Sequence, residues 1–204
     1  MLNVYLFAST LLTLFVILDP PGLMPVFLGL TRDLGTKERR AVALRASTVA
    51  LGIIASFAVF GQQILSYLHI TVESMQVSGG LLLGLVALQM LLGSSDGALN
   101  VDAANRHRVS IVPLGIPLIA GPGSIVAMMV AVDRSRGLPD LLAVGLALLV
   151  ALAVVWLALR YSGTLSRLLR DSGITLLSRV AGMLLAAIAV QMVVDGVMGF
   201  VESA

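Results

Sequence analysis

Long apolar stretches alternate with short polar connections along the whole chain. A bilayer-spanning helix needs about 20 mostly apolar residues, and six stretches meet that need: residues 3–31, 41–66, 75–93, 110–132, 138–159 and 176–200. The pattern therefore predicts an all-α integral membrane protein with six transmembrane helices.

Helix breakers interrupt two of these stretches near their centres. The first stretch contains DPPG at residues 19–22, and the fourth contains GPG at residues 121–123. Proline lacks an N–H and clashes with the preceding helical turn, while glycine adopts backbone dihedrals that other residues avoid. We therefore expect helices 1 and 4 to be broken near the bilayer midplane.

Composition supports a membrane protein and excludes several classes of chemistry. Hydrophobic residues make up 58% of the chain and charged residues 12%, with a mean hydropathy of +1.03, whereas a soluble domain is about half apolar and a quarter charged. The 204 residues leave no long polar segment, so we expect one membrane domain over 1–204. The absence of cysteine excludes disulfides, thiolate catalysis and cysteine-ligated metals.

Basic residues predict the orientation. Eleven of the 13 Lys and Arg residues fall in or beside the first, third and fifth connections, and only Arg134 and Arg136 lie on the opposite side. Because cytoplasmic loops are enriched in Lys and Arg, both termini are predicted to be outside, with the protein in the plasma or inner membrane. The N-terminal stretch lacks basic residues before it and a clear cleavage site after it, so it is predicted to be a retained span.

The two halves of the chain resemble each other. GLLLGLVALQM at 80–90 aligns with GMLLAAIAVQM at 182–192 at an offset of 102 residues, and DPPG at 19–22 aligns with AGPG at 120–123 at an offset of 101. Each half, 1–100 and 101–204, holds three predicted spans, so the second half enters the membrane from the opposite side. This predicts inverted repeats, an arrangement in which transporters place a site between paired broken helices.

Each break creates two polar helix ends inside the bilayer. Carbonyls at the end of an upstream half-helix suit an ammonium group, and N–H groups at the start of a downstream half-helix suit a carboxylate. The candidate substrate-binding residues are Asp19, Pro20, Gly22, Gly121, Gly123 and Ser124.

Asp19 is the strongest argument for a substrate-binding site at the first break. A central aspartate costs roughly 2.5–3.5 kcal/mol on insertion scales, and no Lys or Arg lies in the middle of any span. The side chain must be protonated, hydrated, bonded to backbone groups or paired with a positive ligand. A proton-coupled carrier fits, with H+ as coupling ion, but Asp19 could also simply cap the unwound segment.

Other polar positions are weaker candidates. Gln89 and Gln191 are repeat equivalents, and Asp195 follows Gln191 on the same face, so these three are candidates for a transport pathway, with packing or an interfacial position as the alternative. The small-residue motifs at 80–84 and 182–186 are predicted to pack against the broken helices. His69 and His107 lie in opposite loops, so we expect no metal and no cofactor.

Three stretches carry a family resemblance. DPPGLMPVFLGLT, SGGLLLGLVALQML and PLGIPLIAGPGSI resemble the MarC family, whose members are also grouped as neutral amino acid transporters. The resemblance implies six helices in two inverted halves and small neutral amino acids such as alanine or glycine as substrates, moved with proton coupling or exported. Leu23 departs from the family, which often has Asn there, and this bears on the substrate range.

Other functions remain open at this point. A membrane enzyme would need a catalytic set, and the spans contain no HExxH, GxGD or Ser–His pair. A channel for small solutes would show a continuous polar stripe, whereas polarity here is confined to two breaks. A structural or stress-related membrane protein would not need Asp19. The expected partners are the lipid bilayer and an amino acid, without nucleic acid, and a homo-oligomer stays open.

Overall fold

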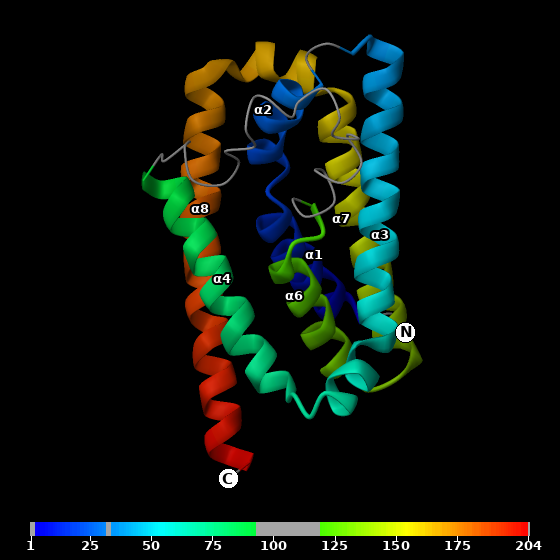
Figure 1. Ribbon diagram of the computed structural model, residues 1–204, viewed down its shortest axis with the longest axis vertical. Helices are drawn as coiled ribbons and strands as arrows, with labels where there is room; N and C mark the ends of the chain where they lie inside the picture. Colours follow the sequence, from blue (N-terminus) through cyan, green and yellow to red (C-terminus); the bar gives the residue numbers. More distant parts are fainter. Residues whose placement is uncertain (1–2, 32–33, 93–118, 204) are drawn as a thin grey trace.

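The computed structural model describes residues 3–31, 34–92 and 119–203 (Figure 1). Every regular element within these residues is a helix, and the helices are α1 (Val4–Leu18), α2 (Pro20–Leu30), α3 (Thr36–Tyr67), α4 (Val72–Leu92), α6 (Pro122–Asp133), α7 (Leu138–Arg160) and α8 (Ser162–Ser203). The predicted all-α class is therefore confirmed.

Five helical segments in the described residues are long and apolar enough to span a membrane. They are Val4–Leu30, which combines α1 and α2, then α3, α4, α7, and Gly173–Glu202 within α8. The 12 residues of α6 are too short to cross alone. The upstream part of the predicted fourth span, and the predicted boundary at residues 100 and 101, lie outside the described residues, so the sixth span stays a prediction.

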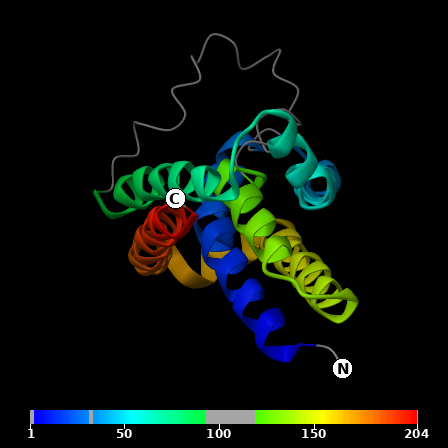
Figure 2. The ribbon, with the colours of Figure 1, turned by 90° about the horizontal axis from the view of Figure 1, so that it is seen from below.

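The helices form a bundle with α1, α2 and α6 at its centre. Figure 1 shows α3 and α7 on one side of these helices and α4 and α8 on the other, and Figure 2 shows α4 and α8 side by side from below. Both chain ends lie toward the lower end in Figure 1, while the end of α2, the start of α3 and the α7–α8 junction lie at the upper end. The predicted breaks therefore belong to the central helices.

The prediction that residues 160–175 form a loop between the last two spans is wrong. These residues are largely helical, because α7 ends at Arg160 and α8 already begins at Ser162. Its first turns run across the top of the bundle in Figure 1. Hydropathy locates the part of a helix that lies in lipid, whereas hydrogen bonding continues a helix into the polar region when no proline interrupts it.

Small residues on α7 allow close packing at the main core. Ala143, Ala147 and Ala151 recur every fourth position and are at most 1% exposed, so they form one stripe along the helix. Ala151 belongs to a hydrophobic core cluster that also includes residues of α1, α2, α3 and α6. The stripe lets neighbouring backbones approach, as expected for helices in membranes.

Glycines hold α4 and α8 together. A Cβ on Gly80 would lie 2.8 Å from the Ala189 carbonyl oxygen, and a Cβ on Gly182 would lie 3.5 Å from the Ala87 carbonyl oxygen. Gly80 and Gly182 are 102 residues apart, and so are Ala87 and Ala189. The contact is therefore reciprocal between the two halves of the chain.

The prediction that these two glycines pack against the broken helices is wrong. Each faces the other long helix instead, because both helices carry matching small-residue faces. The neighbouring Gly79 contacts α6, since its Cβ would lie 2.9 Å from a methyl carbon of Val126. A one-residue shift on α4 thus selects a different partner helix.

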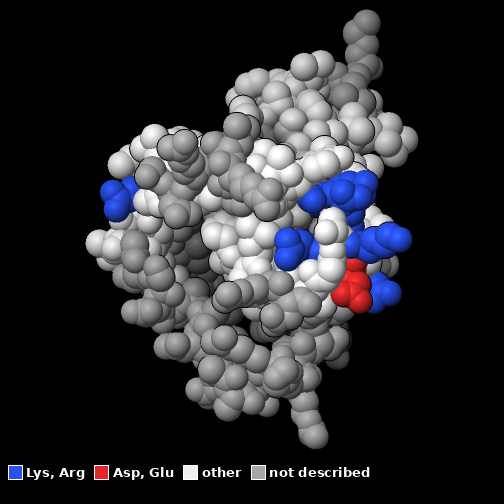
Figure 3. All heavy atoms as spheres, turned by 90° about the horizontal axis from the view of Figure 1, so that it is seen from above, with Lys and Arg blue, Asp and Glu red and all other residues white. Residues whose placement is uncertain are grey.

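Basic side chains gather at one end of the molecule. Figure 3 shows most of the visible Lys and Arg side chains grouped on the face seen from above. The start of α3, with Lys37, Arg39 and Arg40, and the end of α7 at Arg160 lie at this end of the bundle in Figure 1. The guanidinium of Arg39 donates to the Thr31 carbonyl oxygen at 3.0 Å and lies near the start of α8. This asymmetry is the feature on which the predicted orientation depends, and the orientation itself stays a prediction.

Candidate functional site

Asp19 alone separates α1 from α2. Its φ of 39° and ψ of 67° are left-handed, a conformation that few non-glycine residues adopt and that Asp tolerates better than most. The Asp19 N–H donates to the Phe15 carbonyl, and its own carbonyl accepts from the Leu23 N–H, both at 3.1 Å. One residue therefore ends the first helix and begins the second.

The prolines around this junction leave backbone carbonyls without helical donors. Pro20 and Pro21 have no N–H, so the carbonyls of Val16 and Ile17, four residues earlier, have no partner of the usual kind. Pro25, inside α2, has the same effect on the carbonyl of Pro21. The break therefore presents several acceptors within an apolar segment.

The Asp19 carboxylate folds back over the first turn of α2. A Cβ built on Gly22 would collide with Oδ2 of Asp19, so glycine is needed there for the observed side-chain position. The other oxygen, Oδ1, is buried and has no hydrogen-bond partner among the described residues. A buried carboxylate oxygen without a partner is costly, and it marks the place where a proton or a cation would be stabilised.

At the position of the second predicted break, the structure places the start of α6. Gly121 is extended, with φ of −68° and ψ of 165°, and Pro122 starts the helix. The Ser124 hydroxyl is 1% exposed and donates to the carbonyls of Gly121 at 2.9 Å and Ile119 at 3.3 Å. Its proton is thus shared with backbone oxygens, which leaves the hydroxyl oxygen as an acceptor for a ligand.

Gly123 allows α6 to approach α4. A Cβ at Gly123 would overlap the side chain of Leu83, so close packing requires glycine at this position. The two breaks share one hydrophobic cluster, since Leu18 and Leu23 beside the first belong to it together with Ile119 and Ala120 beside the second. Within the described residues no hydrogen bond links the two breaks.

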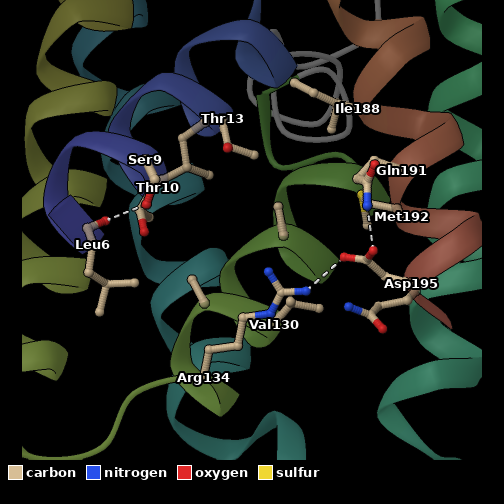
Figure 4. Close-up of a pocket in the computed structure, with 14 residues that line it drawn as sticks. Leu6, Ser9, Thr10, Thr13, Val130, Arg134, Ile188, Gln191, Met192 and Asp195 are labelled. Atoms are coloured by element: carbon tan, nitrogen blue, oxygen red, sulfur yellow. Dashed lines mark hydrogen bonds and ion pairs between the residues drawn. The ribbon is translucent and has the colours of Figure 1, made fainter. Parts of the chain in front are cut away.

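A pocket of about 230 Å³ lies between α1, α4, α6 and α8 (Figure 4). None of the six predicted substrate-binding residues lines it. Two of the predicted pathway residues, Gln191 and Asp195, do line it. The other polar lining residues were not predicted: Ser9, Thr10, Thr13, Gln76 and Arg134.

Asp195 forms a charged link across the pocket mouth. Nη2 of Arg134 lies 2.9 Å from one Asp195 carboxylate oxygen, and Nε2 of Gln191 donates to the other at 2.6 Å. The Arg134–Asp195 contact joins the end of α6 to α8, the Gln191 contact lies within α8, and Figure 4 shows both opposite the hydroxyls of α1. The arrangement places a cation and an anion side by side at a pocket otherwise lined largely by apolar side chains.

Gln89 does not share the surroundings of its repeat equivalent. Gln89 is exposed on α4 and does not line the pocket. The hydroxyls of Thr10 and Thr13 could have been predicted as pocket residues. They are three residues apart in an apolar helix and so lie on the same face. Nothing comparable marked Gln76.

Comparisons with known proteins agree over nearly the whole chain. The sequence profile of the family described as MarC family integral membrane proteins matches residues 4–201 of this chain. A UPF0056 membrane protein of Methanocaldococcus jannaschii is 38% identical over 191 residues, covering 92% of this chain and 93% of that protein. The UPF0056 inner membrane protein YhgN of Escherichia coli K12 is 34% identical over 190 residues, covering 93% and 94% of the two chains.

A more distant relative extends the same match. The UPF0056 membrane protein YvbG of Bacillus subtilis is 29% identical over 194 residues, which cover 92% of each chain. No solved structure matches. Five helices of the described residues, long and apolar enough to span a membrane, and these full-length similarities lead to one conclusion: the chain belongs to the MarC family of integral membrane proteins.

Proposed function

We propose that this protein is a secondary transporter of small neutral amino acids such as glycine and alanine, with H+ as the coupling ion. The observation that carries the proposal is the buried, unpartnered Oδ1 of Asp19 at a helix break. A charge at that position in a membrane must be neutralised by a proton or by a ligand. A group that alternates between these two partners couples proton movement to ligand movement.

The proposal includes two inverted repeats, which would allow alternating access. The reciprocal contacts of Gly80 with Ala189 and of Gly182 with Ala87 are what a pseudo-two-fold axis would produce. Residues early in α4 also meet residues late in α8, since a Cβ on Gly196 would lie 2.8 Å from the Glu73 carbonyl oxygen, so these two helices run in opposite directions. Two inverted halves can rock about a shared central site.

The breaks suggest how the substrate is held. Its ammonium group would lie near the Asp19 carboxylate and the carbonyls of Val16 and Ile17, whose usual helical donors are replaced by prolines. Its carboxylate would meet the N–H groups at the start of α6, near Gly123 and Ser124. The start of α2 is a poorer anion site, because the Asp19 carboxylate already lies over Gly22.

The proposal includes the cellular location. We place the protein in the plasma or inner membrane with both termini outside, because basic residues concentrate at the end opposite the termini. The name of YhgN as an inner membrane protein is in line with this.

Reconstituted transport tests the proposal directly. Purified protein in proteoliposomes is expected to accumulate labelled glycine and alanine when a pH gradient is imposed, with protein-free liposomes as the control. Running the gradient in both directions identifies the direction of coupling. The proposal fails if neither direction, nor exchange against internal amino acid, raises labelled uptake above the control.

Gly22→Ala is expected to reduce that uptake about tenfold or more, because small misplacements at a site are costly. The new Cβ would displace the Asp19 carboxylate, and rotation of this short side chain relieves the collision. Thermal unfolding should therefore stay close to that of the unmodified protein.

Gly29→Ala is the matched control for this substitution. It lies in the same helix, and its Cβ would meet nothing within 4 Å. If both variants transport equally well, the position of the Asp19 carboxylate has no role in the cycle.

A further inference from the structure

The pocket between α1, α4, α6 and α8 contains polar groups that have no hydrogen-bond partner in the part of the chain that the structure describes. Thr10 and Gln76 are only 7% and 8% exposed, and both line the pocket. Among the described residues, neither the Thr10 hydroxyl nor the Gln76 amide takes part in a hydrogen bond. Buried polar groups are normally satisfied, so these two are available to something that enters the pocket.

The mouth of the pocket offers both signs of charge. The Arg134 and Asp195 side chains are 59% and 30% exposed and 2.9 Å apart, so a ligand can reach both. A small zwitterion has the complementary pair, because its carboxylate matches a guanidinium and its ammonium matches a carboxylate. A ligand with only one charge would leave one of the two protein charges without a new partner.

The size of the pocket limits the ligand. Its volume of about 230 Å³ lies below the roughly 300 Å³ at which sites for drug-sized molecules begin. It equals the space of several water molecules, at about 30 Å³ each. The remaining lining includes Leu6, Val130, Ile188 and Met192, which suits a ligand with a short apolar side chain.

We propose that this pocket is a binding site for a small zwitterionic amino acid, separate from the Asp19 break. The ammonium group meets Asp195, the carboxylate meets Arg134, and Thr10 and Gln76 supply the inner hydrogen bonds. The last α1 residue of the lining, Leu14, is five residues before Asp19, about 7.5 Å along a helix. Its role as an entry site on a transport path depends on the proposed function, but binding itself does not.

Calorimetric titration of the full-length protein in detergent tests the ligand class. Glycine and alanine are expected to bind, whereas acetate and methylammonium, which each carry one of the two charges, should bind about tenfold more weakly or worse. Equal binding of either single-charge compound would overturn the zwitterion assignment. Absence of glycine and alanine binding at millimolar concentration would overturn the site.

Variants then locate the binding. Thr10→Val keeps the shape of the side chain and removes the hydroxyl, and it should weaken binding about three- to tenfold. Asp195→Asn should weaken it by more than about tenfold. The matched control is Asp133→Asn, since this exposed carboxylate accepts from Gln62 at 2.7 Å and does not line the pocket.

Asp195 also links two helices, so its variant needs a check on folding. Gel filtration and melting temperature report on this, and Thr10→Val, which breaks no hydrogen bond among the described residues, carries the test if Asp195→Asn is unstable. Binding that survives both substitutions but disappears in Asp19→Asn would move the ligand to the break and overturn the inference. Binding that is lost in the pocket variants of a protein that transports nothing would support the site and refute the proposed function.

Discussion

Asp19→Asn is expected to abolish pH-driven uptake of glycine and alanine while leaving the protein folded. Asn has almost the same shape as Asp but carries no charge at any pH, so it can neither exchange a proton nor neutralise an ammonium group. Removing one partner of a buried charge pair costs about 2 kcal/mol or more, which is about thirtyfold in affinity. The substitution should not harm folding, because Oδ1 makes no hydrogen bond within the described residues.

The measurement compares two modes of transport in proteoliposomes. Gradient-driven accumulation reports on proton coupling, whereas exchange of labelled for unlabelled amino acid reports on binding and movement without net proton transfer. Loss of the first with partial retention of the second would make Asp19 the coupling group. Loss of both would make it part of the substrate site.

Asp133→Asn serves as the matched control. It removes one carboxylate from an exposed position at the end of α6, and its uptake should equal that of the unmodified protein. Undiminished gradient-driven uptake in Asp19→Asn would exclude Asp19 from coupling, and its role would then be limited to the backbone junction between α1 and α2.

Gly80→Ala is expected to destabilise the protein by about 1–3 kcal/mol, the usual cost of adding a methyl group to a tightly packed position. The new Cβ would lie 2.8 Å from the Ala189 carbonyl oxygen and 3.1 Å from the Val193 nitrogen. Both atoms belong to the backbone of α8, so no side-chain rotation can relieve the contact. The two helices must separate, and the hydrophobic cluster that joins them, with Leu83 and Leu185, loses contacts.

Gly84→Ala is the control for this comparison. It lies one turn further along the same helix, and its Cβ would make an ordinary contact at 3.8 Å with Ala189. Replacing glycine in a helix by alanine is favourable by roughly 0.5–1 kcal/mol, so this variant should be as stable as the unmodified protein or more so. Denaturant titration in detergent measures both, and equal midpoints would show that α4 and α8 do not pack as closely as described.

Part of this architecture follows directly from residue chemistry. Pro20 and Pro21 cannot donate backbone hydrogen bonds, which disfavours a continuous helix there, and the structure places the junction at Asp19. The start of α8 could not be located in the same way. Polar and charged residues after Arg160 predict a loop, yet a helix outside lipid accepts such residues freely.

Close packing between helices was predicted in kind but assigned to the wrong partners. Glycine motifs indicate that two helices approach closely, and Gly80 and Gly182 do lie at a close contact between α4 and α8. Which helix they face depends on the rotation of each helix about its axis, which places Gly79 toward α6 and Gly80 toward α8. A shift of one residue turns a side chain by about 100°, and apolar faces all around the helix leave the pattern without a preferred direction.

The sequence by itself determined the membrane class, the break at Asp19 and the family, because hydropathy, proline chemistry and motif order are local properties of the chain. Only the tertiary structure decided which polar residues meet. Arg134 and Asp195 are 61 residues apart and pair across two helices, and Thr10 and Gln76 reach the same pocket from α1 and α4. These meetings depend on helix register and rotation, which are set by packing over the whole bundle and are not encoded in any single stretch.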